Sequence, residues 1–162
     1  MKHLTAAAVF VFALIMQTSA FAEEWSVYES SDYGFSMLVP SGTKLETKEF
    51  GGGWGGLRGA SEGVNLVAVA KLGPAEPAAD IEAFGVQVTG IPKSNWELID
   101  GGSGHGWDWH KTVIARQGNE VYFGGYGVGS RGSYLILLKT TQADFISYRA
   151  DYDDWYDSVR LF

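Results

Sequence analysis

The sequence predicts an α+β fold with a mostly antiparallel sheet, one helix in the middle of the chain and one helix at its C-terminus. Most of the chain consists of apolar or alternating runs bounded by Gly, Pro, Asn and Ser, a pattern typical of strands and turns. Two segments differ, because their apolar residues recur every three or four positions, as along one face of a helix. No repeat or shift of composition marks a boundary, so residues 23–162 are expected to form a single domain.

The first 22 residues have the layout of a secretory signal peptide. Lys2 precedes a mainly apolar run at residues 4–16, and the small-residue pattern Ala-Phe-Ala follows at 20–22. The apolar run has about 13 residues, whereas a bilayer span needs roughly 20. We expect cleavage after Ala22 and a periplasmic or secreted mature chain that has no transmembrane segment.

A series of strands precedes the mid-chain helix. The expected strands span residues 24–28, 34–39, 43–50 and 64–70. The first two are separated by Ser-Ser-Asp-Tyr, which favours a hairpin, and Pro40 ends the second. The fourth is nearly all apolar, which indicates a central strand covered on both faces. The glycine-rich residues 51–56 are expected to be the most flexible stretch, with Trp54 exposed at its centre.

The second half of the chain is expected to contain both helices. Ile81, Phe84 and Val88 recur at helical spacing and predict a helix over residues 78–90. Strands are expected at residues 96–99, 106–116, 121–128 and 134–140, separated by glycine-containing turns. Thr141 can then cap a terminal helix. The apolar face of that helix is formed by Phe145, Tyr148, Tyr152, Trp155 and Val159.

Two segments carry a resemblance to a known family. They are SDYGFSMLVPSG at residues 31–42 and the aromatic terminal helix, which finishes in Ser158 and Val159. In these features the chain resembles the PsbP-like family, exported domains that open with a Gly-Phe-Ser hairpin strand ending in Pro. The resemblance implies an α/β/α sandwich over essentially the whole mature chain. It also implies a non-enzymatic role as an accessory or protein-binding module.

The charge balance excludes several classes of function. There are 12 Lys and Arg against 19 Asp and Glu, for a net charge of −7. Removal of the signal peptide takes away Lys2 and no acid, which leaves 11 basic residues and a charge of −8. No basic cluster is present, so binding to nucleic acid is not expected. The chain has no cysteine, which excludes thiol catalysis and thiolate metal sites.

One cluster of potential metal ligands stands out, at His105, Asp108 and His110. On a strand, positions two apart share a face, so Asp108 and His110 could meet at one cation while His105 approaches from the turn. A divalent zinc, copper or nickel ion would accept such ligands, and it is the one cofactor considered. The favoured alternative is an exposed sheet face without metal. There Asp108, His110, Thr112 and Arg116 make cross-strand contacts while Trp107, Trp109 and Val113 face the core.

A small hydrolase is a weaker interpretation of the same residues. It would use Ser103 or Ser133 as nucleophile, with His110 as base and Asp108 as the orienting acid. Two residues side by side on one strand give an awkward triad, and neither serine lies in a Gly-x-Ser-x-Gly turn. The sequence therefore favours a protein that is not an enzyme.

The terminal helix concentrates negative charge in its C-terminal half, at Asp151, Asp153, Asp154 and Asp157. The helix dipole disfavours acids there, and like charges four residues apart repel each other. Such departures can mark a surface kept for function. We consider a docking patch for a basic protein partner or a loose cation site; the alternative is a solvated helix face that keeps the protein soluble.

Overall fold

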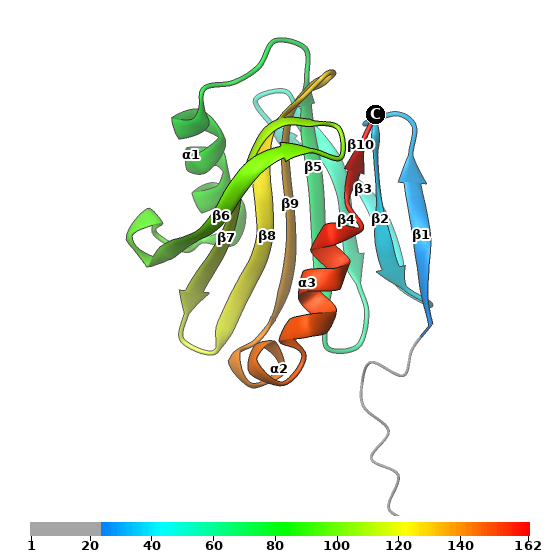
Figure 1. Cartoon of the computed structure of the whole chain (residues 1–162), viewed down its shortest axis with the longest axis vertical. Coiled ribbons are helices and arrows are strands. Elements are labelled where there is room, and N and C mark those ends of the chain that lie inside the picture. Colours follow the sequence, from blue (N-terminus) through cyan, green and yellow to red (C-terminus); the bar gives the residue numbers. More distant parts are fainter. Residues whose placement is uncertain (1–23) are drawn as a thin grey trace, which may run out of the picture.

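The computed structural model describes residues 24–162, which form two antiparallel sheets (Figure 1). The small sheet has the strand order β1-β2-β10, and the large seven-stranded sheet has the order β3-β4-β5-β9-β8-β7-β6. Every strand pairing is antiparallel, which confirms the predicted sheet type. The predicted signal peptide at residues 1–22 and its cleavage point lie outside the described residues.

The strands of the first half are β1 (Trp25–Ser30), β2 (Phe35–Pro40), β3 (Lys44–Gly51), β4 (Trp54–Ala60) and β5 (Asn65–Leu72). Those of the second half are β6 (Trp96–Gly104), β7 (Trp107–Gln117), β8 (Glu120–Gly129), β9 (Gly132–Thr141) and β10 (Arg160–Leu161). The helices are α1 (Ala78–Thr89), α2 (Gln142–Ser147) and α3 (Arg149–Asp157), with a short 3₁₀ turn η1 (Lys93–Asn95).

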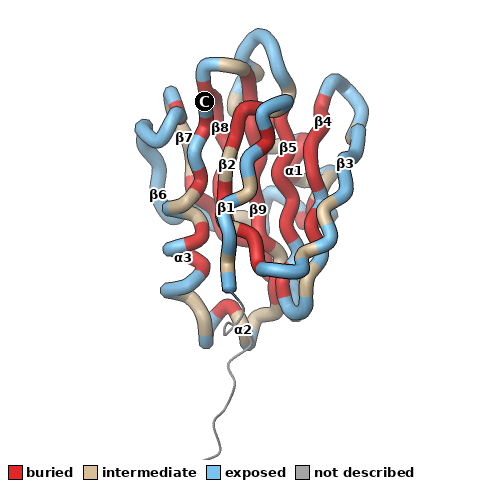
Figure 2. The backbone as a smooth tube through the Cα atoms, turned by 90° about the vertical axis from the view of Figure 1, so that its right-hand side faces the viewer, coloured by how far each residue is buried: buried red, intermediate tan, exposed pale blue. Residues whose placement is uncertain are grey.

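The large sheet is the middle layer of the molecule, and each of its faces is covered by a different core. Helix α1 lies on one face, while α3 and the small sheet cover the other (Figure 1). Alternate residues of one strand belong to different cores: Ala68 contacts the α3 side and Val69 the α1 side. The apolar run predicted to be covered on both faces, now β5, pairs with the central strand β9 of the sheet (Figure 2).

The glycine-rich stretch is better ordered than the sequence suggested. Strand β4 begins at Trp54 and pairs with both β3 and β5. Trp54 is only 5% exposed, and its ring stacks on Phe84 of α1 with centroids 4.2 Å apart. The expectation of an exposed Trp54 is therefore wrong. At Gly56, a Cβ would lie 2.2 Å from the carbonyl oxygen of Ala68, so this glycine serves close strand packing rather than flexibility.

The predicted terminal helix is two helices. Thr141 caps α2 as expected, since its Oγ1 accepts a hydrogen bond from the backbone N–H of Asp144 at 3.1 Å. The helical geometry breaks at Tyr148, where φ is −119° and ψ is 28°, and α3 then begins at Arg149. After α3 the chain adds β10 to the edge of β2, a strand that the sequence did not predict.

Candidate functional site

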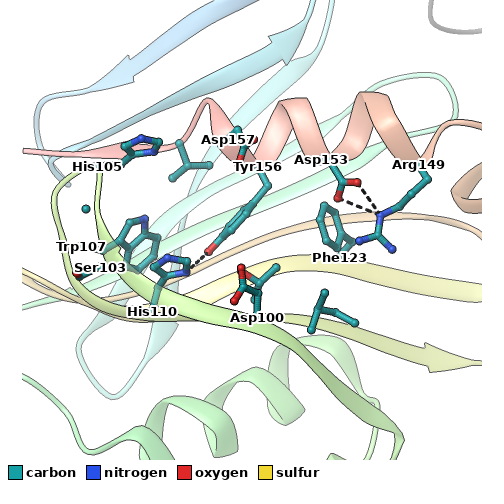
Figure 3. A pocket seen from close by; sticks show the side chains of 14 residues that line it. Asp100, Ser103, His105, Trp107, His110, Phe123, Arg149, Asp153, Tyr156 and Asp157 are labelled. Atoms are coloured by element: carbon teal, nitrogen blue, oxygen red, sulfur yellow. Dashed lines mark hydrogen bonds and ion pairs between the residues drawn. The ribbon is translucent and has the colours of Figure 1, made fainter.

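A cleft of about 360 Å³ lies between α3 and the β6–β7 hairpin; we call it the α3 cleft (Figure 3). Its polar lining includes Asp100, His105 and His110 from the hairpin and Asp153, Tyr156 and Asp157 from α3. Residues of both groups singled out in the sequence, the histidines and the helical acids, therefore face the same cavity. No local pattern in the sequence places the two groups together, because they are some 50 positions apart.

A β-bulge in β7 decides which residues of the hairpin face this cleft. Trp107 pairs with Gly129 and Trp109 with Val128, so Asp108 is an extra residue without a cross-strand partner. Trp107 packs in the core on the α3 side, while Trp109 packs against the core under α1. The expectation that the two tryptophans share a face is wrong, because a bulge shifts the alternation by one residue.

The same bulge separates Asp108 from the histidines. His105 and His110 line the cleft, whereas Asp108 is exposed and does not line it. Within residues 24–162, no group of three or more His, Asp or Glu side chains is placed to hold a metal ion. The structure thus does not bring His105, Asp108 and His110 together as one ligand set, and a metal at these residues stays a prediction.

His105 is held in the turn between β6 and β7. Its φ is 54°, unusual for a residue other than glycine, and its carbonyl oxygen accepts a hydrogen bond from the N–H of Leu161 at 2.8 Å. Its ring Nδ1 lies 2.9 Å from Nη1 of Arg160. At the neighbouring Gly106, a Cβ would lie 1.9 Å from the carbonyl oxygen of Leu161. The turn is therefore fixed by strand β10.

His110 and Tyr156 point toward each other across the cleft (Figure 3). The Tyr156 hydroxyl lies 3.2 Å from Nδ1 of His110 and above Gly125, where a Cβ would be only 1.8 Å from that oxygen. Burial lowers the pKa of His110, although Asp100 opposes this shift. Burial, with Asp157 and Asp100 nearby, raises the pKa of Tyr156. A protonated phenol beside a neutral imidazole allows Tyr156 to donate and His110 Nδ1 to accept.

The acids of α3 are divided between two sides of the helix. Asp153 and Asp157 line the cleft, and Asp153 is paired with Arg149, whose Nε lies 3.0 and 3.1 Å from its two carboxylate oxygens. Asp151 and Asp154 instead line a hollow of about 220 Å³ that also includes Trp25, Leu38 and Trp155. The four-residue patch predicted from the sequence is thus two pairs.

The serines proposed for a hydrolase are not arranged as a triad. Ser103 lines the cleft, but Ser133 is fully buried in β9 and accepts a hydrogen bond from the N–H of Glu76 at 2.8 Å. Nδ1 of His110, the atom that an orienting acid would contact, lies beside Tyr156 instead. No hydrogen bond joins Asp108 to His110 in the described chain.

Three polar residues of the cleft were not predicted from the sequence: Asp100, Arg149 and Tyr156. Asp100 lies between the expected strand at 96–99 and the expected Gly-Gly-Ser-Gly turn, whereas β6 continues to Gly104. Tyr156 is next to Trp155, and the predicted apolar face of the terminal helix included Trp155 and not Tyr156. The signal that could have found it is its spacing from Asp153, which places both on one side of α3.

Comparison with known proteins identifies the fold. No protein-family model matches the sequence, and no curated protein is significantly similar to it. Among solved structures, the chain is similar to cyanobacterial PsbP (CyanoP) from Synechocystis sp. PCC 6803, with a TM-score of 0.58 and 14% sequence identity. The match covers 90% of this chain and 96% of that chain. The PsbP-like fold suggested by residues 31–42 and the terminal helix is confirmed.

None of the helices within residues 24–162 is both long enough and apolar enough to cross a membrane. The longest, α1, has 12 residues and carries Asp80 and Glu82.

Proposed function

We propose, on the premise of the PsbP-like fold, that this chain is an exported, non-catalytic accessory module that binds a basic protein partner at the α3 cleft. One observation carries the proposal: the structure gathers Asp100 of β6 with Asp153 and Asp157 of α3 around one cavity. These residues are about 50 positions apart in the sequence, so their meeting is a property of the fold. The predicted signal peptide supports export.

The cleft has negative charge to spare for a partner. Among residues 24–162, Asp153 forms an ion pair with Arg149, while the carboxylates of Asp100 and Asp157 form none. His110 adds little positive charge at neutral pH, because burial lowers its pKa below the ordinary 6.5. A Lys or Arg side chain entering the cleft would therefore meet two unpaired carboxylates. Complementary charge of this kind raises the association rate and selects the partner.

The chemistry of the cleft supports binding over catalysis. The raised pKa of Tyr156 keeps its phenol protonated, so it is a poor nucleophile at neutral pH. His110 has no carboxylate on its Nδ1 to orient it as a general base. What the cleft offers instead is a set of acceptors and an aromatic wall formed by Trp107, Phe123 and Tyr156. Such a wall suits the aliphatic stem of a basic side chain.

Charge reversal tests the proposal. The mature chain, residues 23–162, is immobilised and exposed to a periplasmic extract of the source organism, and the retained proteins are quantified by mass spectrometry. We expect basic proteins to be retained at low salt and lost at high salt, as surface charge pairs are screened. The double variant Asp100→Lys/Asp157→Lys should retain at least about tenfold less of these proteins.

The matched control reverses two exposed acids outside the cleft, Glu46→Lys/Glu62→Lys, and changes the net charge by the same amount. Glu46 lies on β3, at the opposite edge of the large sheet from β6, and Glu62 lies in the β4–β5 turn. This control variant should retain the same proteins as the wild-type chain. Equal loss in both double variants would show that only net charge matters, and equal retention in both would show that the cleft does not bind the partner.

A further inference from the structure

The opposite face of the large sheet carries a second, basic site. Among residues 24–162, most Lys and Arg side chains contact an acid or a carbonyl oxygen. Those for which the described chain provides no such oxygen partner are Lys44, Lys48 and Arg58, and all three lie on the β3–β4 hairpin. In a mature chain of charge −8, the cations without an oxygen partner are thus gathered in one place.

The strand register explains why this part of the sheet is hollow. In one row across the sheet, Lys44 of β3 is followed by Ala60 of β4, Asn65 of β5 and Lys139 of β9. Two small or short side chains therefore lie between two lysines, on the face covered by α1. The resulting hollow has about 370 Å³, within the roughly 300–1,000 Å³ of small-molecule sites.

Helix α1 is too small to close this hollow. A helix is about 10–12 Å wide with its side chains, whereas seven strands extend over roughly 29 Å. The helix contacts β8 and β9, and one side of the hollow is formed by its Val88 together with Tyr122 of β8. The floor includes Val67 of β5, so apolar surface adjoins the cations.

Arg58 lines the hollow and contacts an aromatic ring. Its guanidinium lies 5.3 Å from the centroid of the Phe50 ring, and the Lys48 ammonium lies 5.6 Å from the same ring. Aromatic contacts of this kind hold the cation while leaving its N–H donors available. Glu46, the directly opposite neighbour of Arg58 on β3, forms no ion pair with it in the described chain, although it is the one acid that lines the hollow.

Lysines on an edge strand also discourage sheet-to-sheet association, and β3 is an edge strand. That role accounts for Lys44 and Lys48 but not for Arg58, which lies on the second strand; Lys139, on the fourth strand, is paired with Glu120. We propose that this hollow, lined by Lys44, Arg58, Lys139, Val67, Val88 and Tyr122, binds a small amphipathic carboxylate. Its head would contact Arg58 and Lys44, and its apolar part would contact Val67, Val88 and Tyr122.

Decanoate is a suitable probe, with calorimetric titration of the mature chain and amide shifts mapped by NMR. We expect decanoate to bind and to shift amides around β3, β4 and the end of α1. The variant Lys44→Gln/Arg58→Gln should weaken binding at least about tenfold, which is about 1.4 kcal/mol. The control Arg116→Gln removes one cation from β7, where Arg116 is paired with Glu97 at 2.8 Å, and should leave binding unchanged.

Two comparison ligands make the outcome decisive. Decanol has the same chain without charge, and inorganic phosphate has charge without a chain; both should bind more weakly than decanoate. Equal binding of decanol would overturn the role of the cations, and equal binding of phosphate would overturn the amphipathic ligand. Absence of decanoate binding, shifts confined to the α3 cleft, or undiminished binding in the double variant would each overturn the site itself.

Discussion

At the scale of single residues, Gly125 and Tyr156 pack tightly against each other in the α3 cleft. The Tyr156 hydroxyl occupies the space that a side chain at position 125 would need, and it reaches His110 from there. Gly125 lies on β8 and Tyr156 on α3, so the absent Cβ of one residue positions the ring of another that is 31 positions away. The position of the Tyr156 ring in the α3 cleft therefore depends on glycine at position 125.

Gly125→Ala is expected to destabilise the protein by about 1–3 kcal/mol, because an added methyl group displaces Tyr156 in a packed site. Urea denaturation measures this change in the free energy of unfolding. Gly102→Ala is the control: its Cβ would lie 3.7 Å from Nε2 of His110, an ordinary contact in the same cleft. Similar losses in both variants would contradict the role assigned to Gly125.

The lowered pKa of His110 predicts how the stability of the folded protein depends on pH. Burial lowers this pKa below its ordinary value of 6.5, so the unfolded chain binds a proton more readily than the folded protein. The stability contributed by neutral His110 is therefore present above about pH 6.5 and is lost as the pH falls through the lower folded pKa. We expect His110→Gln to lose less stability than wild type between neutral pH and acidic pH.

Urea midpoints at two pH values test this, since the carboxylates common to both proteins cancel in the comparison. NMR titration of residues 23–162 provides a direct check, because His105 and His110 are the only histidines in this range. A His110 pKa above 6.5, or equal pH dependence in both proteins, would show that burial does not dominate.

At the scale of elements, two local interruptions decide which side chains face the α3 cleft. The break at Tyr148 divides the expected terminal helix into α2 and α3. The bulge beside Asp108 reverses which residues of β7 face the cleft. Neither departs from the predicted type of element, yet each changes the direction in which side chains point. A period-based prediction assumes an unbroken element and cannot locate such interruptions.

The cap at Thr141 is a prediction that the structure confirms, and its energy can be measured. Thr141→Ala removes the oxygen that accepts the N–H of Asp144 and should cost about 1 kcal/mol of stability. Thr141→Ser keeps an oxygen in the same place and should recover most of the loss in thermal or urea denaturation. Equal destabilisation by Ala and Ser would show that the methyl group, and not the cap, is responsible.

At the scale of the whole molecule, the C-terminal strand joins parts that are far apart in the sequence. Leu161 donates its N–H to His105 in the β6–β7 turn, and the N–H of Phe162 donates to the carbonyl of Gly34 at 3.0 Å. Arg131 in the β8–β9 turn adds hydrogen bonds to the carbonyl oxygens of Ser31 and Asp32. These contacts hold the small sheet against the large sheet.

Deletion of Arg160–Leu161 together with Phe162 should therefore loosen the small sheet. Leu161 is 6% exposed and belongs to the core on the α3 side, so its loss alone should cost about 2–5 kcal/mol. Hydrogen exchange should become faster in β1 and β2, while β8 and β9 stay protected. The control is Phe162→Ala, which removes a half-exposed side chain but keeps the backbone N–H that donates to Gly34. Unchanged exchange in β1 and β2 after the full deletion would contradict this prediction.

The sequence by itself determined the α+β class, the antiparallel strands, the positions of α1 and the Thr141 cap, and the likeness to PsbP-like domains. It could do so because periodicity, turn residues and capping are properties of neighbouring positions. It also singled out His105, His110 and the acids of the terminal helix, but as two separate groups.

Only the tertiary structure decided that His110, Asp100 and Asp157 share one cleft while Asp108, Asp151 and Asp154 do not. It also decided that Lys44 and Arg58 meet across a hollow on the opposite face of the sheet. Both facts depend on strand register and on where a helix crosses the sheet. Those features are fixed by packing between segments far apart in the chain, and no local pattern in the sequence encodes them.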